Sequence, residues 1–93
     1  MIVSFKDKLT ETLFRTGHHK KIPPDVVKRA IKQLDRIDAA SRIEDMRFPP
    51  SNHFERLTGT KPPRYSIRVN RQYRISFEWT DTGVENVCFE DYH

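Results

Sequence analysis

The chain has 93 residues, of which 35% are hydrophobic and 32% are charged, so it is long enough for one hydrophobic core but not for a second. Seventeen Lys and Arg residues against 13 Asp and Glu residues give a net charge of +4. This excess favours an anionic partner, either a nucleic acid or an acidic protein. Charge begins at Lys6, too early for a signal peptide, and no apolar run reaches the length of a membrane span. We therefore expect a single domain, residues 1–93, that is soluble and cytoplasmic and has no contact with a membrane.

The first elements predicted are a short strand over residues 1–5 and a helix over residues 6–16. The helix ends at Gly17, because glycine adopts the left-handed conformation that commonly closes a helix. One side of this segment is apolar and consists of Phe5, Leu9, Leu13 and Phe14.

A second helix is predicted from Pro23-Pro24-Asp25 to a point near Ala40, because proline suits a first turn and an acidic residue suits the helix dipole. Its apolar stripe has helical spacing and consists of Val27, Ala30, Ile31, Leu34 and Ile37. Basic residues occupy the connector before this helix and its opposite face. This basic set is either a solvated surface or a contact with ribosomal RNA; its members are Lys20, Lys21, Lys28, Arg29, Lys32 and Arg36.

Residues 41–64 contain two proline pairs and predict only a short strand or turn at 54–57 and a turn at Gly59. Beyond them, apolar and polar residues alternate over 65–69 and 73–79, which is typical of strands with one buried face. A loop of residues 70–72 pairs Ile67 with Ile75 and Val69 with Tyr73. A second three-residue loop at 81–83 pairs Ile75 with Phe89 and Phe77 with Val87. One compact α+β domain follows, with the helices covering the apolar face of the sheet.

The polar face of this sheet places Arg68 directly opposite Arg74. Like charges in such a pair are unfavourable by about 0.2–1 kcal/mol, so either a bound phosphate or the neighbouring Glu90 should compensate. The cluster is thus either an anion site or a surface ion-pair network. On an open polar face, replacing Arg74 should change stability by less than about 1 kcal/mol.

The chain ends on Asp91-Tyr92-His93, an acid, a phenol and an imidazole. Cleavage of RNA by its own 2′-hydroxyl needs a base, a cation facing the phosphate and an acid for the leaving oxygen. Arginine suits the phosphate through its planar fork of donors, and histidine suits either proton role near neutral pH. Strict alternation, however, places Arg74, Glu90 and Tyr92 on one face and Asp91 and His93 on the other. The tail must therefore leave regular strand geometry for His93 to reach the same phosphate as Arg74.

Neither a metal site nor a cofactor is expected. His18 and His19 are adjacent and lack a third ligand, and the sequence contains no glycine-rich phosphate loop. The single Cys88 lies between Val87 and Phe89, which predicts a packed thiol on a strand rather than a nucleophile.

Two segments, Tyr65–Trp79 and Asn86–His93, resemble the C-terminal half of HigB-type toxins, a group within the RelE/ParE superfamily of bacterial toxin–antitoxin systems. Residues 1–5 and 34–40 are also similar to that family, so the resemblance covers nearly the whole chain. It implies a RelE-like microbial RNase fold, in which two N-terminal helices pack on a mostly antiparallel twisted sheet. It also implies a metal-independent mRNA endonuclease that acts in the ribosomal A site, contacts ribosomal RNA and inhibits growth. A helix-turn-helix antitoxin of the HigA type would silence it and give it indirect contact with operator DNA.

The resemblance also implies roles for individual residues. Arg74 would face the scissile phosphate, Asp91 and His93 would handle protons, and Tyr92 would hold a base. Further contacts with RNA phosphates are expected from Arg56, Lys61, Arg68 and Arg71. Glu55 and Thr58 stand where relatives carry a histidine and a lysine, which implies a weaker or differently arranged nuclease.

Two other functions are open. One is a ParE-like toxin that binds DNA gyrase and cleaves nothing, and the other is a small basic module that binds RNA or the ribosome. Neither needs Arg74 together with Asp91, Tyr92 and His93, so these four residues separate the nuclease from both alternatives.

Overall fold

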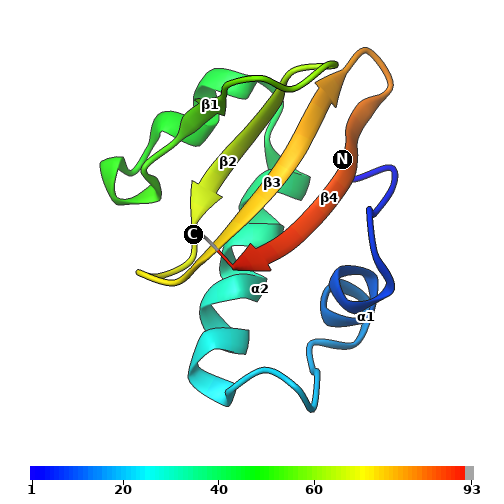
Figure 1. Ribbon diagram of the computed structural model, residues 1–93, viewed down its shortest axis with the longest axis vertical. Coiled ribbons are helices and arrows are strands. Elements are labelled where there is room, and N and C mark those ends of the chain that lie inside the picture. Colours follow the sequence, from blue (N-terminus) through cyan, green and yellow to red (C-terminus); the bar gives the residue numbers. More distant parts are fainter. Residues whose placement is uncertain (92–93) are drawn as a thin grey trace.

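The computed structural model of the protein describes residues 1–91. Four strands form an antiparallel sheet in the order β1-β2-β3-β4, with bounds Glu55–Leu57, Arg64–Arg68, Tyr73–Thr80 and Gly83–Asp91. Two helices, α1 (Lys8–Thr16) and α2 (Pro24–Ala39), pack against this sheet, and α2 runs behind the central strands in Figure 1. Two short 3₁₀ helices, η1 (Ile43–Arg47) and η2 (Pro50–Asn52), lead from α2 to β1. The predicted α+β architecture is confirmed.

Both predicted helices form, and local signals set their ends. The carboxylate of Asp7 accepts a hydrogen bond of 2.9 Å from the amide of Thr10 at the start of α1. Gly17 ends α1 with φ of 72°, and its amide donates to the carbonyl of Leu13 at 2.9 Å. Pro24 and Asp25 form the first turn of α2. None of the helices within residues 1–91 is long and apolar enough to cross a membrane.

The core lies between α2 and the apolar face of the sheet. Leu34 and Ile37 of α2 and Ile67, Ile75 and Phe77 of the central strands are completely buried. The predicted pairing of β2 with β3 is confirmed, because Ile67 lies opposite Ile75. Two-residue alternation therefore decided which side chains of these strands meet the helices.

The β3–β4 hairpin differs from its prediction. Gly83 pairs with Thr80 as the first residue of β4, so the loop contains two residues, 81–82, rather than three. The register then shifts between Ser76 and Glu78, where Asn86 adopts a left-handed conformation with φ of 51°. This bulge inserts one residue into β4, and the predicted pair Phe77–Val87 falls within the irregularity. Because loop and bulge offset each other, Ile75 still lies opposite Phe89 as predicted.

The N-terminal segment lies beside β4, but the strand predicted for residues 1–5 is reduced to two isolated bridges. Ile2 and Phe5 form parallel bridges with Val84 and Val87. Gly83 permits this close approach: a Cβ atom at this position would lie 2.6 Å from Cγ2 of Val3. The start of the chain is thereby joined to the strand that leads to the C-terminus (Figure 1).

Candidate functional site

Arg74 is the charged residue at the centre of the polar face, and it is buried with 6% exposure. Its Nε donates to Oγ of Ser66 at 2.8 Å. Its Nη2 donates to the carbonyl of Ser66 at 3.2 Å and to the carbonyl of His53. The segment that precedes β1 therefore covers this part of the face. The expectation that Arg74 stands on an open polar face is wrong.

Glu55 of β1 is an acid beside Arg74, with Oε1 lying 3.6 Å from Nε. Arg68 does lie opposite Arg74, and Glu90 lies opposite it on the other side, as predicted. The guanidinium of Arg68, however, turns to the loop, where Nε donates to the carbonyl of Asn70 at 3.0 Å. Repulsion between the two arginines is thus relieved by the orientation of Arg68 and by Glu55. Sequence reasoning treated Glu55 only as a departure from a family pattern and missed this ion pair.

Asp91 lies at the end of β4 opposite Tyr73, next to the pair formed by Arg74 and Glu90. Asp91 is exposed, and its Oδ2 accepts a hydrogen bond of 3.2 Å from Nε2 of Gln72. Tyr92 and His93 lie outside the described residues, so their predicted action together with Arg74 and Asp91 stays a prediction.

A basic groove with a volume of about 860 Å³ lies between α2, the η2 segment and the β2–β3 loop. Its cationic residues are Arg29, Lys32, Arg36, Arg68 and Arg71, and His53 also lines it. A smaller hollow of about 240 Å³ shares His53, Arg68, Asn70 and Arg71 with the groove and extends it to Arg74. The structure therefore brings three of the predicted ribosome contacts together with two of the predicted phosphate contacts.

Other predicted contacts lie elsewhere. Lys20 and Lys28 line a separate pocket of about 560 Å³ with an apolar floor that includes Ile22 and Val27. Arg56 lies on β1 and lines a third hollow, and Lys61 is exposed in the loop before β2. The predicted basic set is therefore not one surface.

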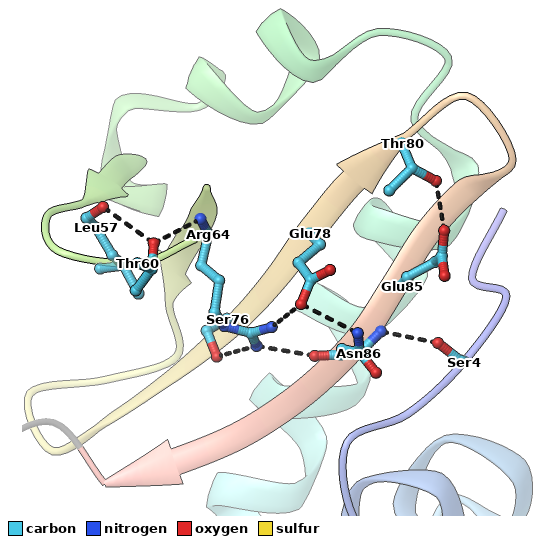
Figure 2. A network of polar contacts seen from close by, with 9 residues as sticks. All are labelled: Ser4, Leu57, Thr60, Arg64, Ser76, Glu78, Thr80, Glu85 and Asn86. Carbon is cyan, nitrogen blue, oxygen red and sulfur yellow. Dashed lines mark hydrogen bonds and ion pairs between the residues drawn. The ribbon is translucent and has the colours of Figure 1, made fainter. Parts of the chain in front are cut away.

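A second arginine network, missed at the sequence level, joins β2, β3 and β4 on the polar face (Figure 2). Nη1 of Arg64 lies 3.1 Å from Oε2 of Glu78, and Nη2 donates at 2.8 Å both to Oγ of Ser76 and to the carbonyl of Asn86. Nδ2 of Asn86 donates to the same oxygen of Glu78 at 3.0 Å. Because the bulge residue Asn86 contributes two of these contacts, periodicity alone could not reveal the network. It ties strands together at a site with little access for a ligand, since Arg64 and Glu78 side chains are only 12% and 15% exposed.

Cys88 is buried, which confirms the predicted packed thiol. Burial, the largest effect, and the nearby carboxylates of Asp7 and Glu90 raise the pKa of Cys88 to about 12. The thiol is therefore protonated at neutral pH and unsuited to nucleophilic attack.

Comparison with known proteins adds to this geometry. Residues 3–93 match the family model described as RelE-like toxin of type II toxin-antitoxin system HigB. The chain is 39% identical over 94 residues to Toxin HigB-1 of Vibrio cholerae serotype O1, covering 100% of this chain and 98% of that protein. It is 31% identical over 93 residues to Endoribonuclease HigB of Proteus vulgaris, covering 100% of both chains.

Proposed function

The chain belongs to the RelE-like HigB toxins of type II toxin–antitoxin systems, and we propose that it is an endoribonuclease that cleaves mRNA on the ribosome. The observation that carries the proposal is the β3–β4 register. It places Arg74 opposite Glu90 and Tyr73 opposite Asp91, so the backbone of the acid–phenol–imidazole tail starts one residue beyond the Arg74–Glu90 pair, although the side chain of Asp91 belongs to the Tyr73 side of the sheet. The relative named as an endoribonuclease matches over its full length, which supports the same chemistry.

In the proposed reaction the 2′-oxygen of the RNA attacks the adjacent phosphorus and the 5′-oxygen leaves. Asp91 removes the 2′ proton, and His93 protonates the leaving oxygen. Arg74 supplies positive charge at the phosphate, where negative charge accumulates in the transition state. Its hydrogen bonds to Ser66 and His53 fix the plane of the guanidinium before substrate arrives. Tyr92 stacks on a base next to the cleaved bond.

Glu55 affects the rate of cleavage that Arg74 can support. Its carboxylate lies 3.6 Å from Nε of Arg74, so it offsets part of the charge that a phosphate would meet. Glu55→Gln should therefore raise the cleavage rate if Arg74 acts on the phosphate through its charge.

The proposed partners are an antitoxin with a helix-turn-helix domain, which would hold the toxin inactive and contact operator DNA, and the ribosome, which would present mRNA for cleavage. A toxin of a type II system implies the antitoxin; the DNA-binding domain and the ribosome are part of the proposal.

The proposal is tested by brief induction of the chain in cells, with newly formed mRNA 5′ ends mapped at nucleotide resolution. The parent should produce new ends within translated codons, and both Arg74→Lys and His93→Gln should abolish them at equal levels of folded protein. Purified protein should cut the same mRNA with ribosomes and not without them.

Growth arrest with no new mRNA ends would refute the nuclease. If DNA breaks that depend on gyrase accompanied that arrest, the ParE-like alternative would replace it. Cleavage by both variants at the parental rate would refute the assigned site.

A further inference from the structure

We propose that the basic groove binds backbone phosphates of the single-stranded substrate RNA next to the cleaved bond. Arg29, Lys32 and Arg36 would then be substrate-binding residues rather than contacts with ribosomal RNA. The identity of the anion rests on the proposed function, whereas the existence of an anion site rests on the groove itself.

The positive charge of the groove is not balanced by an acidic residue within its lining. None of its lining residues, all of which lie within the described range, carries a carboxylate. The described part of the chain pairs Arg15, Arg42, Arg64 and Arg74 with acids, but it shows no ion pair for any of the five groove cations. Cations gathered in a concave site concentrate positive potential there and attract an anionic partner.

Two buried amides hold the groove together without neutralising it. Nη1 of Arg36 donates to Oδ1 of Asn52 at 2.8 Å and to Oε1 of Gln33 at 3.2 Å. Nε2 of Gln33 donates to Oδ1 of Asn52 at 3.0 Å and to the carbonyl of Arg68 at 2.7 Å. Asn52 and Gln33 are 1% and 7% exposed. An ionised acceptor in their place would cancel the charge of Arg36, whereas an uncharged amide positions the guanidinium and leaves its charge available to a phosphate.

The groove also leads to the proposed site of cleavage. The hollow that it shares with Arg74 contains His53, whose carbonyl accepts from Arg74 and whose Nε2 lies 3.4 Å from Nη1 of Arg68. At the loop, Gln72 lines the groove and hydrogen-bonds Asp91. An RNA strand with its scissile phosphate at Arg74 therefore has the adjacent phosphates within reach of Arg68 and Arg71. The phosphates further along the RNA are within reach of α2. A positively charged groove that tracks the backbone is the usual way in which proteins bind single-stranded nucleic acid.

The test compares two double variants that remove the same charge. Arg29→Gln/Lys32→Gln alters two exposed groove residues, and Lys20→Gln/Lys21→Gln alters two exposed residues outside it. Binding of a short, fluorescently labelled, 2′-O-methylated oligoribonucleotide, which cannot be cleaved, is measured across a salt series. Loss of two phosphate contacts should reduce the slope of log K against log salt by about 1.4, since each contact with a single strand contributes about 0.7. The control variant should keep the parental slope. Equal slopes for the groove variant and the parent, equal losses in both variants, or no binding by the parent would overturn the inference.

Ribosome co-sedimentation separates the two possible RNA partners. The groove variant should bind ribosomes that carry no mRNA as the parent does, because ribosomal RNA is not the ligand of the groove. If it loses ribosome binding but keeps oligonucleotide binding, Arg29 and Lys32 contact ribosomal RNA and the inference is wrong. If oligonucleotide binding depends on the groove but the parent cleaves no RNA in cells, the proposed nuclease fails while the groove remains an RNA-backbone site.

Discussion

Arg74→Ala is expected to lower the free energy of unfolding by about 3 kcal/mol, although Arg74 lies on the sheet face opposite the helices. The guanidinium donates to Oγ of Ser66, the carbonyl of Ser66 and the carbonyl of His53. Hydrogen bonds from a charged donor contribute about 1.5–3 kcal/mol each. The hollow beside Arg74, about 240 Å³ in volume, can admit water to the freed acceptors and recover part of this energy. The pair with Glu55, whose side chain is 41% exposed, adds less than about 1 kcal/mol.

The assay is urea and thermal unfolding followed by the fluorescence of Trp79. A loss of about 3 kcal/mol corresponds to a fall in Tm of roughly 12–24 °C for a domain of this size. Arg71→Ala is the matched control: Arg71 is exposed and, in the described part of the chain, forms no ion pair. Removing the side chain of Arg71 should lower the free energy of unfolding by less than about 0.5 kcal/mol. If the two variants unfold at the same urea concentration, the burial of Arg74 described above is wrong. If they differ as expected, any loss of toxicity in Arg74→Ala has to be measured per folded molecule.

Three further outcomes are expected. Iodoacetamide at pH 8 should alkylate Cys88 far more slowly in the native protein than in urea. Burial, followed by Asp7 and Glu90, raises the pKa of Cys88 from 9.0 to about 12. The stability that the protonated thiol contributes is therefore fully present below pH 9 and lost between about pH 9 and 12, and Cys88→Ala should remove this part of the pH dependence. Equal alkylation rates in the native protein and in urea would contradict the burial of Cys88. Gly83→Ala should destabilise the protein by about 2 kcal/mol or more, because its Cβ would lie 2.6 Å from Val3 and 2.7 Å from the carbonyl of Met1 at φ of 136°. Hydrogen exchange at the amide of Val84, which donates to that carbonyl at 2.9 Å, should accelerate, and unchanged protection would show that the N-terminal segment tolerates the substitution. Deletion of Tyr92-His93, or a long C-terminal tag, should impair toxicity while antitoxin binding survives; toxicity equal to that of an N-tagged control would remove the chain end from the mechanism.

The sequence by itself determined the helices and the pairing of the central strands. Gly17 ends α1 as predicted, through a local hydrogen bond. The expected start at residue 6 is two residues early, because the carboxylate of Asp7 caps a helix that begins at Lys8. Strand alternation assigned Ile67 and Ile75 to the buried face, because a slip by one residue would expose both. The family resemblance carried by residues 65–79 and 86–93 was likewise a property of the sequence, and the family match over residues 3–93 confirms it.

The shortened β3–β4 loop could not be read in the same way. Asp81-Thr82-Gly83 suits a three-residue loop, yet Gly83 is the first residue of β4, and the N-terminal segment approaches it closely. The hydroxyls of Thr80 and Thr82 then donate to Glu85 at 2.6 and 2.8 Å, and these contacts hold the pKa of Glu85 below its ordinary value. The loop that forms is thus shorter than the local turn signal predicts, at the place where the N-terminal segment lies against β4.

Only the tertiary structure decided that Arg74 is buried and that the basic residues of α2 line a groove. Alternation assigns Arg74 to the polar face, but whether that face is open depends on the path of the chain from η2 into β1. That path places the carbonyl of His53 and the carboxylate of Glu55 beside the guanidinium. The basic residues of α2 likewise became part of a groove only because Gln33 and Asn52 join α2 to β2 and to the η2 segment. Periodicity reports the direction of a side chain relative to its own strand or helix, whereas exposure and shared sites depend on segments distant in sequence that pack over it.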